Sequence, residues 1–141
     1  MEQRVHLISL GVADLDRAAA FYEALGWIRV EGAPEGMRVY NLLGSVLGLY
    51  DCAALARDAG LEEVGTGAAS LGCNQVDRAG VDAVMACAEA AGATITRAAH
   101  DTFWGGYGGY FTDPDGHLWE VAHNPFVPLS AEGGFQWPQT P

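Results

Sequence analysis

The sequence contains no lysine, so its seven basic residues are all arginine, against 18 aspartates and glutamates and a formal net charge of −11. Nucleic acids and anionic membranes require a basic patch on a protein that binds them, and the arginines form no such cluster. We therefore expect neither nucleic acid nor a membrane as a partner.

Long apolar runs are also absent. The run near the N-terminus, Leu7 to Ala13, is too short to span a bilayer, and Asp14 and Asp16 follow it in place of a cleavage site. The few cysteines are odd in number, lack metal-site spacing and suit a reducing compartment; they are Cys52, Cys73 and Cys87. We expect a soluble cytoplasmic protein.

A chain of 141 residues, half of them hydrophobic, is long enough for one domain with an ordinary core. Its local signals give the same order twice: a strand, a helix and then three strands. The predicted strands are Val5–Val12, Trp27–Glu31, Met37–Leu43, Val46–Tyr50, one within Ala69–Val76, one near Thr94–Arg97, and the two arms of a hairpin in Tyr110–Val121. The predicted helices are an Ala-rich one between Asp14 and Gly26, a short one from Asp51 to Ala59, and one from about Val81 to Ala91.

This order predicts an α+β fold of paired βαβββ modules, whose curved sheets enclose a cavity. The first module covers about residues 1–60, an acidic, Gly-rich linker covers 61–67, and the second module covers 68–126. Residues 127–141 contain several prolines and no periodicity, so we expect an extended tail, with Phe126, Phe135 and Trp137 as possible anchors.

The clearest local motif is Tyr110–Val121, which reads YFTDPDGHLWEV. Asp113–Gly116 has the residues of a tight turn, and β-rich residues on both sides predict a hairpin. Strand alternation places Glu120 in a row with the apolar Leu118 and Ala122. A carboxylate in such a row indicates an edge position or a functional site.

This hairpin resembles the second hairpin of the vicinal-oxygen-chelate superfamily, which includes glyoxalases, bleomycin-resistance proteins, fosfomycin-resistance enzymes and extradiol dioxygenases. The stretch LGVADLDRAAAFYEALGW, Leu10 to Trp27, resembles its opening strand, turn and helix. The resemblance covers residues 1–126 as a single domain and implies the same paired βαβββ modules and a homodimer. It also implies that Glu120 matches a metal ligand of the metal-dependent members.

The other ligand positions of the superfamily can be compared one by one. The first falls on Leu7 and the second on Gly48, neither of which has a donor atom in its side chain. The third falls within Leu71–Cys73, where only Cys73 is a possible ligand. One carboxylate cannot hold a divalent ion tightly, so we predict no cofactor and no metal, with Glu120 as the single ligand if a metal is bound.

Aromatic residues and glycines alternate in Phe103–Tyr110, FWGGYGGY. One interpretation is a pocket wall on which Trp104 and Tyr107 stack a planar ligand; the other is a Gly-rich loop whose aromatic residues belong to the core. The predicted ligand-binding residues are Trp104, Tyr107, Tyr110, Gly48, Tyr50 and Leu7. Glu120 is the candidate catalytic residue, as a general base, or alternatively a buried carboxylate held by neighbouring donors.

The leading hypothesis is a protein that binds a small planar or cationic molecule in an aromatic, acidic cavity without metal. The alternative is a lyase, isomerase or dioxygenase-type enzyme of the same superfamily that uses Glu120 as base or metal ligand. A third possibility is a structural or regulatory module whose cavity is filled by side chains.

Overall fold

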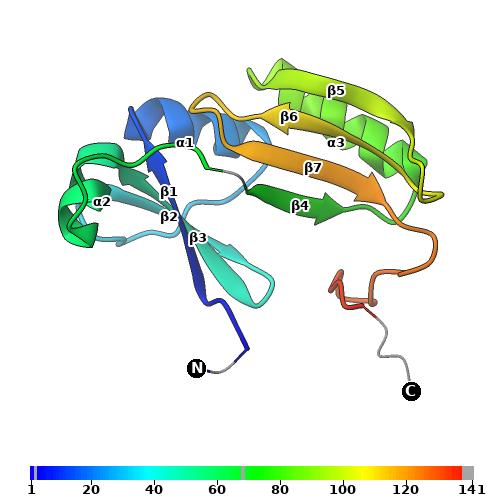
Figure 1. The fold of residues 1–141 in the computed structure, drawn as a ribbon, viewed down its shortest axis with the longest axis horizontal. Helices are drawn as coiled ribbons and strands as arrows, with labels where there is room; N and C mark the ends of the chain where they lie inside the picture. Colours follow the sequence, from blue (N-terminus) through cyan, green and yellow to red (C-terminus); the bar gives the residue numbers. More distant parts are fainter. Residues whose placement is uncertain (2, 68, 138–141) are drawn as a thin grey trace. The chain divides into compact units, whose positions relative to one another are not determined.

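The computed structural model describes residues 1, 3–67 and 69–137 (Figure 1). The strands are β1 (Leu7–Val12), β2 (Met37–Leu42), β3 (Ser45–Asp51), β4 (Ser70–Asn74), β5 (Thr94–Asp101), β6 (Tyr107–Thr112) and β7 (Leu118–His123), and the helices are α1 (Leu15–Ala24), α2 (Cys52–Ala59) and α3 (Arg78–Ala90). No helix in the described ranges has the length and apolar character needed to span a bilayer.

The chain divides into two compact units. Unit 1 is Met1–Ala68 with Pro114–His117, and unit 2 is Ala69–Asp113 with Leu118–Pro141. Each unit contains a strand, a helix and a further run of strands in that order, which confirms the predicted α+β fold of two βαβββ modules. The stretch between α2 and β4, residues 61–67, contains neither helix nor strand.

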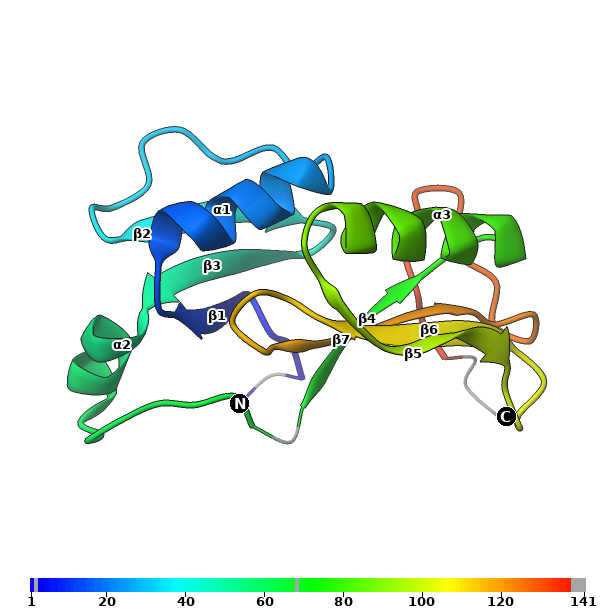
Figure 2. The same cartoon turned by 90° about the horizontal axis from the view of Figure 1, so that it is seen from above.

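Unit 1 has a sheet in the order β1-β3-β2, in which β1 is parallel to β3 and β2 is antiparallel to it. Helix α1 runs along one face of this sheet (Figure 2). The core between them is made of fully buried apolar side chains from both, among them Val12, Tyr22, Tyr40, Leu47 and Leu49. Burying such side chains contributes about 1.5–3 kcal/mol each, so this interface stabilises the unit.

The boundaries of α1 follow from its sequence. The Asp14 side chain accepts hydrogen bonds from the backbone N–H groups of Asp16 (3.0 Å) and Arg17 (2.9 Å), which have no partner within the helix. The helix ends before Gly26, whose positive φ of 89° favours glycine. The predicted cap and stop residues of this helix are both confirmed.

The predicted strand Trp27–Glu31 is wrong. Only Arg29 pairs with β2, in an isolated bridge to Tyr40. The Trp27 ring packs instead against the rings of Tyr22 and Tyr40, with centroids 5.2 and 5.8 Å away. These ring contacts of the half-buried Trp27, and the turn that begins at Glu31, limit the segment to a single bridge.

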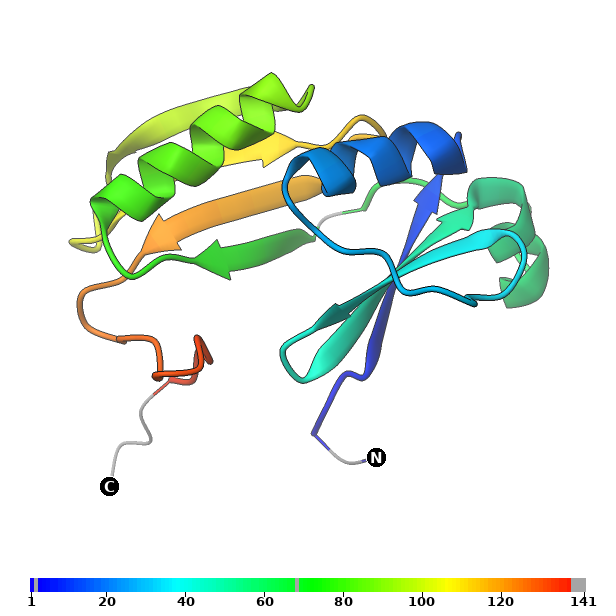
Figure 3. The same ribbon diagram turned by 180° about the vertical axis from the view of Figure 1, so that it is seen from behind.

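Unit 2 has a sheet in the order β4-β7-β6-β5, in which β4 and β7 are parallel and the other neighbours antiparallel. Helix α3 covers one face (Figure 3) and buries Val81, Met85 and Ala88. The rings of Phe111 and Trp119 stack beside each other, with centroids 6.2 Å apart and planes 9° from parallel. Helix α3 begins earlier than predicted because Asp77 caps it, accepting from the N–H of Gly80 at 2.7 Å.

The turn between β6 and β7 belongs to unit 1. One Asp115 carboxylate oxygen accepts from the Ala13 N–H at 2.8 Å and from the Arg17 guanidinium at 2.7 Å. His117 Nε2 lies 2.8 Å from the Gly11 carbonyl oxygen. The last of these contacts gives His117 a structural partner in the backbone.

Candidate functional site

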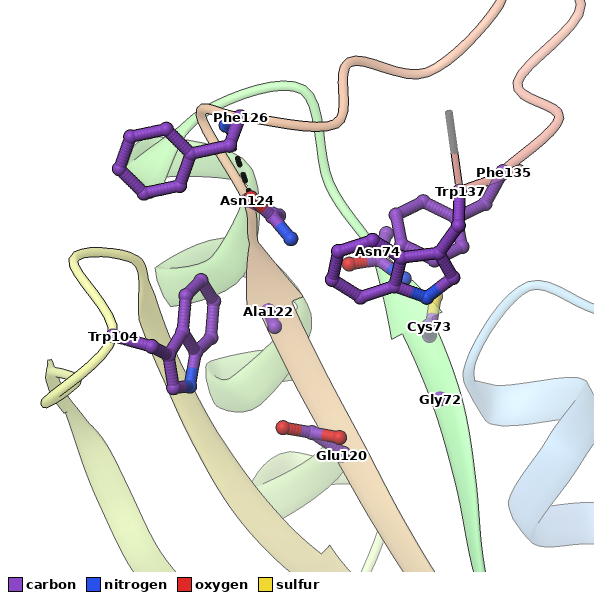
Figure 4. A pocket seen from close by; sticks show the side chains of 10 residues that line it. All are labelled: Gly72, Cys73, Asn74, Trp104, Glu120, Ala122, Asn124, Phe126, Phe135 and Trp137. Carbon is purple, nitrogen blue, oxygen red and sulfur yellow. Dashed lines mark hydrogen bonds between the residues drawn. The ribbon is translucent and has the colours of Figure 1, made fainter. Parts of the chain in front are cut away.

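A cavity of about 660 Å³ lies in unit 2, on the face of the sheet that α3 does not cover (Figure 4). Its base is formed by strand residues Gly72, Glu120 and Ala122. Its walls carry aromatic side chains from three loop segments: Trp104, Phe126, Phe135 and Trp137. The volume falls within the range of small-molecule sites, about 300–1,000 Å³.

Glu120 lies at the base of this cavity, with its carboxylate in the hollow (Figure 4). The strand register places Tyr110 of β6 on one side of it and Gly72 of β4 on the other. The Tyr110 hydroxyl donates to Glu120 Oε1 at 2.8 Å. A Cβ added to Gly72 would meet no atom within 4 Å, so the space beside the carboxylate is open on that side.

The hydrogen bond to Glu120 raises the pKa of Tyr110 above its ordinary value, and burial and the glutamate charge act in the same direction. The positive charge of Arg97 opposes this shift. Tyr110 is therefore protonated at neutral pH and available as a donor. It fixes one oxygen of Glu120, so the carboxylate keeps one orientation at the base of the cavity.

Trp104 forms one wall, in the loop between β5 and β6. A Cβ at Gly106 would lie 1.9 Å from the Trp104 ring, so the indole lies directly against the loop backbone. Thr102 holds the loop: its hydroxyl oxygen accepts from the Gly106 N–H at 2.9 Å and its carbonyl from the Gly105 N–H at 3.1 Å. Gly105 and Gly106 thus allow the close backbone approach that accommodates the Trp104 ring.

Tyr107 does not line this cavity. Its hydroxyl donates to Asp82 of α3 at 2.8 Å, and the Arg78 guanidinium lies 4.7 Å from the centre of its ring. The hydrogen bond to Asp82 raises the pKa of Tyr107, with burial as a second cause. Tyr107 and Tyr110 are three residues apart on β6, and an odd separation places them on opposite faces of a strand. The structure therefore brings Trp104, Tyr110 and Glu120 together and leaves Tyr107 on the helix-covered face.

The remaining predicted ligand-binding residues belong to unit 1. Leu7 is half exposed on β1, and a Cβ at Gly48 would lie 3.6 Å from its Cδ1 and 3.0 Å from Met37 Cε. Tyr50 donates a hydrogen bond to Asp58 of α2, which raises its pKa. Leu7, Gly48 and Tyr50 are not among the residues that line the unit 2 cavity. Their predicted role in binding stays a prediction.

The side chains near Glu120 do not fit a tight metal centre. In the ranges the structure describes, no group of three or more His, Cys, Asp and Glu side chains is placed to hold an ion. Cys73 accepts a hydrogen bond from Gln75 Nε2 at 3.2 Å, and burial raises the pKa of its thiol. Cys73 and Glu120 together offer one thiol and one carboxylate to the cavity, too few donors to hold a divalent ion tightly.

The sequence interpretation missed the aromatic residues that follow β7 as part of a site. Phe126, Phe135 and Trp137 all line the cavity. The available signal was Phe135-x-Trp137, two large aromatic residues in a segment otherwise rich in proline and polar residues. Aromatic residues outside a periodic core pattern indicate an anchor or a binding surface.

Comparison with known proteins identifies the family to which this fold belongs. The sequence matches the family model of the Glyoxalase/Bleomycin resistance protein/Dioxygenase superfamily over residues 4–121. A solved glyoxalase-related enzyme from Fulvimarina pelagi is 36% identical, with a TM-score of 0.90 over 98% of this chain and 100% of that one. No match was found among curated proteins.

Two more distant structures share the fold. A lactoylglutathione lyase from Agrobacterium tumefaciens is 26% identical, with a TM-score of 0.69 over 88% of this chain and 96% of that one. A glyoxalase/bleomycin resistance protein/dioxygenase family enzyme from Burkholderia phytofirmans PsJN is 20% identical, with a TM-score of 0.75 over 83% and 95%. The chain therefore belongs to the glyoxalase/bleomycin resistance protein/dioxygenase superfamily.

Proposed function

We propose that the protein binds a small planar cation in the unit 2 cavity, with Glu120 as the counter-charge and without a resident divalent metal. One observation carries this proposal: a single carboxylate lies at the base of a cavity walled by aromatic side chains, and none of the lining residues is basic. The rings attract a cation through their negative faces, and the carboxylate adds direct charge attraction.

The charge of the whole chain acts in the same direction. A formal net charge of −11 raises the local concentration of cations and disfavours anionic ligands. The aromatic walls favour a flat ligand, because ring stacking gives the largest contact area. The charge of the chain and the flat aromatic walls of the cavity together support a planar cationic ligand with a single ring or two fused rings.

The test is calorimetric titration with N-methylquinolinium, quinoline and 1-naphthoate, which share a flat bicyclic shape and differ in charge. We expect affinity to fall in that order. Glu120→Gln should weaken N-methylquinolinium about tenfold, since an ion pair at close range contributes ~1 kcal/mol in water and more near a protein surface. Glu63→Gln removes the same charge from an exposed position and should leave affinity nearly unchanged. Equal binding of naphthoate would overturn the proposal.

Trp104→Ala tests the stacking wall. Loss of an aromatic stack is expected to cost about 1–3 kcal/mol of binding free energy. Phe103 is fully exposed and outside the cavity, so Phe103→Ala is the matched control. The melting temperature of Trp104→Ala should change far less than the affinity; an unfolded variant would show that Trp104 belongs to the core.

Elemental analysis of protein purified without chelator or His-tag, together with titration of Ni²⁺, Zn²⁺, Mn²⁺ and Fe²⁺, tests the metal-free part. We expect no stoichiometric ion, because tight sites need several convergent protein ligands. One equivalent of metal that is lost in Glu120→Gln would contradict this and favour a metalloenzyme.

A second candidate is an enzyme of the same superfamily that uses Glu120 as a general base. The hydrogen bond from Tyr110 to Glu120 Oε1 favours it, because the base is oriented and the other oxygen remains for a substrate proton. The similarity to a glyoxalase-related enzyme and to a lactoylglutathione lyase supports the same candidate. Turnover of a bound probe, abolished by Glu120→Gln with binding retained, would establish it.

A homodimer and a cytoplasmic location remain proposals that rest on the family resemblance and on composition. Sedimentation at micromolar concentration tests the first. A monomer there would exclude a stable dimer.

A further inference from the structure

We propose that the C-terminal aromatic pair, Phe135 and Trp137, determines specificity: it selects a flat aromatic cation over a compact one by covering the ligand on the side opposite Trp104. This inference rests on the proposed binding of a cation in the unit 2 cavity. It concerns a segment that follows the last strand.

The pair and Trp104 lie on opposite sides of β7, with Glu120 and Ala122 between them (Figure 4). Trp104 comes from the loop before β6, and the pair lies above β4. A bicyclic ring placed over Glu120 would have an aromatic wall on each side. A compact cation has too little surface to contact both walls at once.

Specific local bonds place the pair. Val127 is buried and fixes the start of the segment. Ser130 and Gly134 then close a tight turn, with Ser130 N–H donating to the Gly134 carbonyl at 2.9 Å and Gly134 N–H to the Ser130 hydroxyl at 3.0 Å. Gly133, inside the turn, has a φ of 86°. This turn redirects the chain so that the residues after it reach the cavity.

The two rings support each other but leave much surface uncovered. Their centroids are 6.0 Å apart at an interplanar angle of 77°, an edge-to-face contact. Trp137 is nevertheless 70% exposed although it lines the cavity. An exposed indole beside an open hollow is poorly explained by core packing and well explained by a ligand that covers it.

Because of the way this segment is held, its effect on ligand binding can be measured separately from the stability of unit 2. The backbone hydrogen bonds described for residues 129–137 join residues of the segment itself, at the turn between Ser130 and Gly134. The pair contributes no residue to the buried core. Truncating it should therefore change the cavity and leave the stability of unit 2 nearly unchanged.

The test compares two cations in the full-length chain by calorimetry: N-methylquinolinium, which is flat, and tetramethylammonium, which is compact. We expect Phe135→Ala/Trp137→Ala to weaken N-methylquinolinium at least about tenfold, within the range for losing an aromatic stack. The same variant should weaken tetramethylammonium by less than about threefold, because Trp104 and Glu120 remain to bind it. Phe103→Ala is the control for loss of an exposed ring.

The outcomes separate the two proposals. Unchanged binding of both cations in the double variant, or equal weakening of both, would overturn the role of the pair. In that case, weaker binding of N-methylquinolinium to Glu120→Gln would still uphold the cation site. Failure of the unmodified protein to bind either cation would overturn the proposed function and this inference with it. The urea midpoint of each variant shows whether it is folded, and single variants replace the double one if it is not.

Discussion

The two units share a strand plan, to which unit 2 adds a fourth strand, and they differ in what the sheet faces away from their helices carry. In each, the first strand is parallel to the last and a helix covers one face. Their cores are filled in different ways. In α1 a small buried residue, Ala19, is followed three positions later by the large Tyr22. In α3 the order is reversed, with the large Met85 followed three positions later by the small Ala88. The same backbone plan thus tolerates a redistribution of core volume.

The exposed faces differ more. Gly48 on β3 lies beside Ser9 and Val39, whereas Glu120 on β7 lies beside Gly72 and Tyr110 in the same relative position. Met37 reaches across Gly48, so the site of the absent side chain is occupied by a methyl group. The parallel pairing of first and last strand is therefore common to both units, while the candidate site lies in unit 2.

Removing the large helix residue of unit 1 should have the largest effect on stability. Tyr22 is fully buried and packs against the rings of Trp27 and Tyr40. Tyr22→Ala should lower the free energy of unfolding by about 3–5 kcal/mol, measured by urea denaturation. Leu43, largely exposed, provides the control, and Leu43→Ala should stay within about 0.5 kcal/mol. A cost below about 1 kcal/mol for Tyr22→Ala would show that the core repacks around the missing ring.

Strand glycines of the two units should differ in their tolerance of a methyl group. A Cβ at Gly109 would lie 2.8 Å from the Arg97 carbonyl oxygen and 2.9 Å from the Ala99 nitrogen, both backbone atoms at the bulge in β5. Gly109→Ala should therefore cost about 1–3 kcal/mol. At Gly48 the nearest atom is the flexible end of Met37, so Gly48→Ala should cost less than about 1 kcal/mol. Equal urea midpoints for the two variants would contradict this difference.

Much of the fold follows from local signals in the sequence. Asp14, Asp51 and Gly60 mark helix ends by side-chain capping and positive φ, interactions that involve only a few neighbouring residues. Alternation along β7 likewise predicts that Glu120 faces away from Trp119, as it does. Such features can be read from sequence because the residues responsible lie within a few positions of each other.

The site was predicted less completely because its walls come from distant segments. Trp104 and Glu120 were expected and lie in one cavity, but Phe135 and Trp137 reach it only through the turn between Ser130 and Gly134. No periodic pattern encodes that route. Tyr107 lies outside this cavity for a different reason, because its odd separation from Tyr110 places it on the other face of β6.

The stability lost on removing a helix cap should differ between the two units by a smaller amount than the stability lost at the two glycines. Asp77 accepts one backbone N–H, from Gly80, whereas Asp14 accepts two. Asp77→Ala should cost about 1 kcal/mol in urea denaturation at neutral pH, and Asp14→Ala should shift the midpoint further. A larger shift for Asp77→Ala would indicate that the hydrogen-bond count does not decide the cost.

The Asp14 cap should also depend on pH. The hydrogen bond from the Arg17 N–H lowers the pKa of Asp14 below its ordinary 3.8, against a smaller effect of desolvation. A carboxyl group whose pKa is lower in the folded state stabilises that state above its ordinary pKa, and this contribution is lost as pH falls through the lowered value. The difference between the unmodified protein and Asp14→Ala should therefore be full at pH 7 and shrink in acid below 3.8.

The smallest expected effect is a titration shift that compares a tyrosine–carboxylate pair in each unit. Tyr110 donates to Glu120 in unit 2 and Tyr50 to Asp58 in unit 1, and in both cases this hydrogen bond is the leading cause that raises the tyrosine pKa above 10.0. Glu120→Gln should lower the pKa of Tyr110 towards 10.0. The measurement is phenolate absorbance against pH, with Tyr110→Phe identifying the contribution of Tyr110.

The matched variant Asp58→Asn should lower the pKa of Tyr50 and leave that of Tyr110 unchanged, since each carboxylate acts on its own partner. The raised tyrosine pKa values also determine the direction in which the stability changes with pH. A phenol whose pKa is raised by folding contributes fully below 10.0 and loses that contribution as pH rises through the raised value. The stability advantage of the unmodified protein over Tyr110→Phe should therefore be constant near pH 7 to 9 and decline in alkali. A Tyr110 pKa that does not respond to Glu120→Gln would mean that the hydrogen bond does not orient the carboxylate, and the general-base role of Glu120 would lose its structural support.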